Sequence, residues 1–112
     1  MSDSPQMIFV NLPVRDLEAS KTFFAALGYT FNPAYTDANA ACMIISDSIF
    51  VMLLVESFFA QFTTQPISDA RRQTEVITCL SAGSRTAVDA LVDTALKAGA
   101  REPQPARDYG LM

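Results

Sequence analysis

The sequence has no histidine and no tryptophan among its 112 residues, and only four glycines. Without histidine no Ser-His-Asp catalytic set can form, and the commonest nitrogen ligand of metal ions is missing. The glycines are Gly28, Gly83, Gly99 and Gly110. Their spacing forms no Gly-x-x-x-x-Gly-Lys phosphate-binding loop. These absences exclude two common kinds of catalytic site.

Clustered basic charge and long apolar runs are also missing. The formal net charge is −4, and the basic pair Arg71 and Arg72 is flanked by Asp69 and Glu75. A nucleic-acid partner is therefore not expected. The longest apolar run, Ile49–Val55, is far shorter than the roughly 20 residues of a membrane span. We expect a cytoplasmic protein with no membrane and no nucleic-acid partner.

Cysteine is scarce, with two residues, Cys42 and Cys79. Both lie in apolar, strand-like runs without Cys-x-x-Cys spacing, and we interpret them as reduced thiols of the core. Half of the residues are apolar, which is enough for one small folded domain with one core.

Two segments of the chain repeat one plan, in which a short β-like run is followed by a helix N-cap residue, an amphipathic helix and a glycine. The members are residues 7–14, Asp16 and Gly28 in the first segment, and residues 75–81, Ser84 and Gly99 in the second. The interval from cap to glycine is three residues longer in the second segment. The second helix should therefore be nearly one turn longer.

Further elements are expected between these segments. Residues 29–36 predict a strand interrupted by Pro33, and residues 40–45 and 49–55 predict a hairpin. Residues 49–55 are apolar on both faces, so one face should meet helices and the other should line an enclosed surface. Three aromatic residues predict a helical turn in the connection, namely Phe58, Phe59 and Phe62.

The predicted order is thus β-α-β-β-β followed by β-α and thirteen residues after Gly99. Thirteen residues are too few for three further strands. The expected fold class is α+β, with paired βαβββ modules and a second module truncated at the C-terminus. We expect one domain over residues 1–112, with module one at about 7–56, a connection at 57–73 and an incomplete module two at 74–112.

Several short motifs carry a resemblance to a known superfamily. They are residues 14–20 (Val-Arg-Asp-Leu-Glu-Ala-Ser), 23–24 (Phe-Phe), 27–29 (Leu-Gly-Tyr), 88–91 (Val-Asp-Ala-Leu), 98–100 (Ala-Gly-Ala) and 108–112 (Asp-Tyr-Gly-Leu-Met). By their order and spacing the chain resembles the vicinal oxygen chelate superfamily, which includes glyoxalase I, extradiol dioxygenases, and fosfomycin- and bleomycin-resistance proteins. The resemblance implies paired βαβββ modules with curved sheets, usually assembled as a dimer.

The resemblance also implies where metal ligands would lie. The first-strand positions fall at Phe9 and Ile77, and the last-strand position of module one falls near Met52. The fourth ligand would come from a strand beyond Met112. Because these side chains offer no oxygen or nitrogen donor, we expect no metal cofactor and a binding or otherwise uncharacterised role. The alternative is a metal-dependent lactoylglutathione lyase or dioxygenase-type enzyme, completed by residues beyond Met112 or by a partner chain.

An apolar cup on the concave face of the sheet is the expected site for an unknown small molecule. Its candidate residues are Phe9, Asn11, Met52, Leu54, Glu56, Ile77, Cys79 and Tyr109. The Asn11 amide either binds the ligand or bonds to neighbouring backbone. Glu56 is a base, a cation partner or a solvated strand end. Cys79 needs a positive neighbour to act as a thiolate, and Tyr109 lies at the rim or packs internally.

A homodimer is the expected assembly, because module two lacks the strands that its repeat requires. Module one of each chain should meet module two of its partner. The aromatic segment with Phe58, Phe59 and Phe62 should lie at or near that contact.

Overall fold

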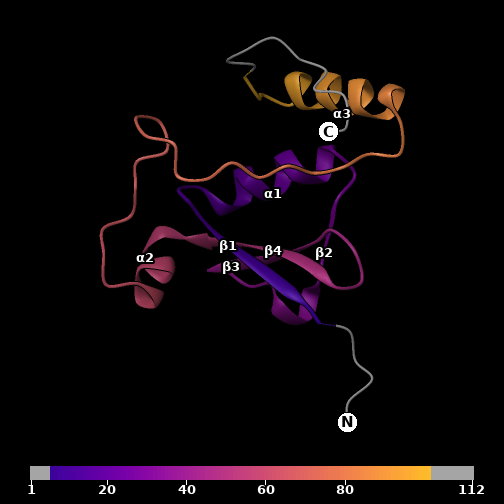
Figure 1. Cartoon of the computed structure of the whole chain (residues 1–112). Coiled ribbons are helices and arrows are strands. Elements are labelled where there is room, and N and C mark those ends of the chain that lie inside the picture. Colours follow the sequence, from indigo (N-terminus) through magenta and orange to yellow (C-terminus); the bar gives the residue numbers. More distant parts are fainter. Residues whose placement is uncertain (1–5, 102–112) are drawn as a thin grey trace. The chain divides into compact units, whose positions relative to one another are not determined.

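The computed structural model describes residues 6–101 (Figure 1). The chain divides into two compact units, one ending at Leu80 and one beginning at Ser81. In chain order the elements are β1 (Ile8–Val14), α1 (Leu17–Ala26), β2 (Thr30–Phe31), the 3-10 turn η1 (Pro33–Tyr35), β3 (Ala40–Ile44), β4 (Ile49–Val55), α2 (Glu56–Phe59), the 3-10 turn η2 (Ala60–Phe62) and α3 (Arg85–Lys97). The α+β class is confirmed.

The four strands form one sheet in the order β1-β4-β3-β2. β1 runs parallel to β4, with Ile8 opposite Ile49 and Val14 opposite Val55. β3 pairs antiparallel with β4, as the predicted hairpin requires. β1 is an edge strand, which accommodates Pro13 because the missing N–H faces no ladder partner.

One face of the sheet forms the core and is covered by α1 (Figure 1). Side chains of a β-strand alternate between faces, so every second residue of β1 and β4 points to this side. The buried members of the core are Leu17, Ala41, Met43, Val51 and Leu53. Leu17 of α1 thus belongs to the core, and Phe24 of the same helix packs against it.

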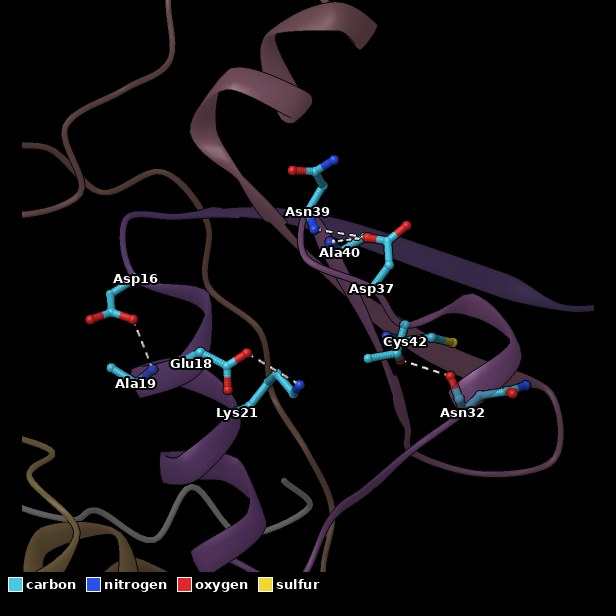
Figure 2. Close-up of polar contacts among 10 residues, drawn as sticks. Asp16, Glu18, Ala19, Lys21, Asn32, Asp37, Asn39, Ala40 and Cys42 are labelled. Atoms are coloured by element: carbon cyan, nitrogen blue, oxygen red, sulfur yellow. Dashed lines mark hydrogen bonds and ion pairs between the residues drawn. The ribbon is translucent and has the colours of Figure 1, made fainter.

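The two long helices begin and end as predicted. Asp16 Oδ1 accepts a hydrogen bond from the Ala19 N–H at 3.0 Å (Figure 2). Ser84 Oγ accepts one from the Ala87 N–H, also at 3.0 Å. These side chains satisfy first-turn donors that have no partner within the helix.

Both helices end at a glycine in the left-handed region. Gly28 has φ +97° and Gly99 has φ +112°, conformations that a Cβ atom would strain. α1 has 10 residues and α3 has 13, so the expected excess of three residues is confirmed.

The segment between α1 and β3 is less regular than expected. A strand was predicted over residues 29–36, but β2 has only two residues before η1 begins at Pro33. Proline favours the first position of a helical turn, and Asn32 caps that turn by accepting the Ala34 N–H at 2.9 Å. The Asn32 N–H still donates to the Cys42 carbonyl at 2.9 Å (Figure 2).

The turn into β3 is held by one carboxylate. Asp37 Oδ1 accepts hydrogen bonds from the Asn39 and Ala40 N–H groups at 2.8 and 3.0 Å (Figure 2). Aspartate favours such turns because its side chain bonds to backbone two or three residues ahead. These two hydrogen bonds fix the turn at residues 37–39 that leads into β3.

The strand predicted at residues 75–81 is wrong. These residues form neither strand nor helix, and all of them are exposed. A strand needs a ladder partner, and β1 has β4 in that role. Within residues 6–101 no strand pairs with residues 75–81. β-propensity alone does not hold a strand.

The connection after β4 contains the predicted helical turn. The predicted aromatic turn is present as α2 and η2, where the rings of Phe58 and Phe62 meet edge to face at 5.2 Å between centroids. None of the helices within residues 6–101 is long and apolar enough to span a bilayer.

Candidate functional site

The face of the sheet opposite α1 carries an aromatic pair at the start of β1 and β4. Phe9 lies opposite Phe50 in the register, and their rings stack with centroids 4.9 Å apart and planes 13° apart. Phe9 is 48% exposed. The pair therefore presents an accessible aromatic surface.

This face becomes buried farther along the sheet. Met52 is half-buried, whereas Leu54 on β4 and Cys42 on β3 are almost fully buried. The short helix α2 packs against β1 and β4. Burial raises the pKa of the Cys42 thiol, which keeps it neutral at physiological pH. The accessible part of the face is thus limited to Phe9, Phe50 and Met52 with their neighbour on β1.

That neighbour is Asn11, which lies opposite Met52. Its side chain is exposed, and its Nδ2 donates to the Phe9 carbonyl oxygen at 3.1 Å. The sequence left open whether the Asn11 amide binds a ligand or bonds to neighbouring backbone. In the structure it bonds to neighbouring backbone. The bond fixes the amide beside the aromatic pair.

Glu56 stands at the first position of α2, where it acts as a cation partner. Its Oε1 lies 3.3 Å from Arg15 Nε. Arg15 Nη2 in turn lies 3.3 Å from Asp69 Oδ1, so one guanidinium joins two carboxylates. All three side chains are at least one-third exposed, and such pairs are weak in water. The cluster links the end of β1 to the connection.

The remaining candidates do not gather on this face. Ile77 is 83% exposed and Cys79 is exposed, because the run that contains them is not a strand. The expectation that Cys79 belongs to the core is therefore wrong, whereas it is correct for Cys42. Tyr109 lies outside the described residues. Among the candidates, the structure brings together Phe9, Asn11, Met52 and Leu54.

A divalent metal does not fit the positions that the resemblance implies. Phe9 and Met52 lie on the same face of neighbouring strands, and neither has an oxygen or nitrogen donor. Within residues 6–101 no three His, Cys, Asp or Glu side chains lie close enough together to hold an ion.

Sequence reasoning did not single out Phe50 or the hollow beside β1. Phe50 shares a face with Met52 by simple alternation, and its pairing with Phe9 needed the strand register. The hollow has a volume of about 350 Å³ and its walls include parts of the connection, whose path no periodicity fixes. Its lining residues are Val10, Asn11, Leu12, Pro13, Phe59, Thr63, Gln65, Pro66, Ile67, Ser68, Glu75 and Val76.

Comparisons with known proteins agree with this geometry. The family model "Bleomycin resistance protein-like N-terminal" matches residues 6–46, the span from β1 through β3. A structure of the hypothetical protein SA1046 from S. aureus superposes with a TM-score of 0.68 at 29% identity, over 96% of this chain and 80% of that one. No curated protein matches the chain.

A second structure is that of a glyoxalase/bleomycin resistance protein/dioxygenase family enzyme from Burkholderia phytofirmans PsJN. It superposes with a TM-score of 0.60 at 20% identity, over 85% of this chain and 74% of that one. At this identity the similarity concerns the fold alone. The chain thus has an α+β fold like that of these two structures. The match over residues 6–46 agrees with the resemblance of the chain to the vicinal oxygen chelate superfamily.

Proposed function

We propose that this protein binds a small, largely apolar molecule on the sheet face around Phe9 and Phe50, without a divalent metal. The observation that carries the proposal is the accessible stacked pair at the position where the resemblance would put a metal ligand. Sequestering such a molecule needs no catalytic group. The resemblance to the superfamily supports a role in binding a small molecule. The apolar residues on this face support an apolar ligand.

The chemistry of the face favours a flat apolar ligand. An aromatic ring that stacks on Phe9 gains roughly 0.5–1.5 kcal/mol beyond the burial of its area. Met52 is flexible and polarizable, so it adapts to ligands of different outline. Asn11 lies at the margin and can orient one polar group of the ligand.

A fluorescent naphthylamine probe, N-phenyl-1-naphthylamine, tests this site. Phe9→Ala should raise its dissociation constant about tenfold, because the stacking surface is lost. Tyr35→Ala is the matched control, since Tyr35 is 64% exposed but lies in η1, outside the pair. Equal losses in the two variants, or none in Phe9→Ala, would contradict the proposal.

Whether ligand binding depends on a metal ion is tested separately. Probe affinity should be the same in EDTA and in added Zn²⁺, Ni²⁺ or Fe²⁺, and elemental analysis should find no stoichiometric metal. One equivalent of metal, lost on chelation together with an isomerase or dioxygenase activity, would favour the alternative enzyme.

The same proposal includes a cytoplasmic homodimer. The apolar stripe of α3 remains partly exposed, and its exposed members are Val88, Val92 and Leu96. Phe62 is 69% exposed. Both described thiols are free, as is usual in a reducing compartment. A second copy would cover this apolar surface by an isologous contact.

Sedimentation at micromolar concentration tests the dimer. Val92→Glu should shift the population toward monomer, while Asp93→Lys, a charge change at the neighbouring position, should not. A stable wild-type monomer would refute this part of the proposal and leave ligand binding untouched.

A further inference from the structure

The outer edge of β1 carries a short set of unpaired backbone groups. Among residues 6–101, β1 pairs with β4 alone. The Ile8 N–H donates to the Ser48 carbonyl at 2.9 Å, so the Ile8 peptide groups face β4. Successive residues of a strand point their N–H and C=O groups to opposite sides. The groups of Phe9, Asn11 and Pro13 therefore face the open edge.

Two of these three positions are blocked for strand pairing. Pro13 has no N–H to donate. The Phe9 carbonyl already accepts the Asn11 side-chain amide at 3.1 Å. A long partner strand would leave groups unpaired opposite both positions, which is a known protection of edge strands. In the part of the chain that the structure describes, the N–H and C=O of Asn11 have no partner, so both remain available between these two positions.

The hollow of about 350 Å³ lies against this edge. Phe59, Pro66 and Ile67 provide apolar walls, and Phe59 and Ile67 are themselves half-buried. Glu75 is the only charged side chain among the lining residues. The volume lies in the lower range of small-molecule pockets. The hollow thus combines one peptide-sized hydrogen-bonding position, an apolar wall and one carboxylate.

We propose that this hollow binds a short peptide or peptide-like amide with a basic group. The ligand carbonyl accepts from the Asn11 N–H, and the ligand N–H donates to the Asn11 carbonyl. Its apolar part packs against Pro66 and Ile67, and its cationic group lies toward Glu75. This is strand-edge recognition limited to one residue by Pro13 and by the Asn11 side chain. It goes beyond the proposed function, because it uses the edge of β1 and not the aromatic face.

NMR titration with N-acetyl-Ala-Lys-methylamide tests the site. The amide signals of Asn11, Ile67 and Val76 should shift saturably, while those of α3 stay unchanged. The matched probe N-acetyl-Ala-Glu-methylamide should bind about tenfold more weakly. In Glu75→Gln the two probes should bind alike, since the charge that distinguishes them is gone. Equal binding of both probes to the wild type would overturn the proposal.

Ligand length provides an independent test. The wild type should bind an extended hexapeptide no better than the dipeptide, because the flanking edge positions are blocked. Asn11→Ala frees the Phe9 carbonyl and keeps the backbone donor, so it should retain the dipeptide and gain several-fold in affinity for the hexapeptide. A wild type that prefers the hexapeptide would mean that β1 is an ordinary strand-pairing edge, and the proposal would fail.

Discussion

The helices α1 and α3 follow the same sequence plan, yet their side chains are buried to different extents. Leu17 in α1 is only 5% exposed and belongs to the core of the sheet. α3 has no buried residue, and Val88 and Leu96 in its stripe are 45% and 38% exposed. Caps and periodicity form both helices. The run before α1 has a ladder partner in β4, whereas the run before α3 has none within residues 6–101.

Helix formation here depends on local interactions, whereas strand formation depends on tertiary contacts. A cap hydrogen bond joins residues three apart and forms without the rest of the protein. A strand is completed only by another strand, which the chain must bring from a distance. Sequence repeats therefore predict helices more securely than strands.

Thiol labelling should show the largest difference between the two regions. Cys79 is exposed in residues 75–81, whereas Cys42 is 1% exposed in β3 and the pKa of its thiol is raised by burial. With a disulfide reagent, Cys79 should react about a thousandfold faster, since Cys42 must wait for the sheet to open. Time-resolved absorbance of Cys42→Ala and Cys79→Ala variants separates the two rates.

Equally fast reaction of both thiols would contradict the burial of Cys42 in the sheet. Slow reaction at both would mean that residues 75–81 are covered in solution, as a dimer that pairs this run would require. Repeating the measurement over a range of protein concentrations distinguishes a dimer from cover within one chain.

A core truncation should be the next largest effect. Leu53→Ala removes a side chain that is 1% exposed at the centre of the core and should lower the free energy of unfolding by about 2–5 kcal/mol. Val92→Ala in α3 should cost less than about 1 kcal/mol, because Val92 is 37% exposed. Urea unfolding followed by circular dichroism measures both.

Comparable costs for the two variants would show that α3 buries its stripe in solution. Val92→Ala in a dissociated, dilute sample then tells whether a second copy supplies the cover. A small cost for Leu53→Ala would refute the core itself.

The first half of the fold could be predicted well because its signals are local or mutually dependent. Asp16 and Gly28 predicted the bounds of α1, and the two apolar faces of residues 49–55 predicted a strand that is covered on both sides. The strand predicted at residues 75–81 was wrong because an apolar, β-like sequence indicates a propensity but does not determine which strand it would pair with.

The site was only partly predictable for the same reason. Alternation predicted that Phe9 and Asn11 share one face of their strand, and that Met52 and Leu54 share one face of theirs. Only the register of β1 and β4 shows that these two faces lie side by side. The burial of Leu54 and Cys42 depends on α2 and on neighbouring strands. The hollow beside β1 depends on the path of the connection, which contains no repeating pattern.

The two helix caps should have similar local strengths and different global consequences. Asp16→Ala and Ser84→Ala each remove one hydrogen bond of 3.0 Å and should each weaken their helix by about 1 kcal/mol. The loss at Asp16 should appear in the unfolding of the sheet, because α1 is part of its core. The loss at Ser84 should appear as fraying of α3. Amide hydrogen exchange resolves the two, and Asp16→Asn and Ser84→Thr, which retain a capping oxygen, are the controls.

The smallest effect should come from Arg15, whose repeat position in the second segment is Gly83. Arg15 joins Glu56 and Asp69 at 3.3 Å each, with more than half of its own side chain exposed. Solvent screens such pairs, so Arg15→Gln should cost less than about 1 kcal/mol at low salt. At about 1 M salt, where the screening length is roughly 3 Å, the cost should nearly vanish. Arg71→Gln, which affects only the 3.7 Å pair with Asp69, is the control. A salt-independent loss above about 2 kcal/mol would mean that this cluster is desolvated, and that the connection is held to β1 much more firmly than its exposure indicates.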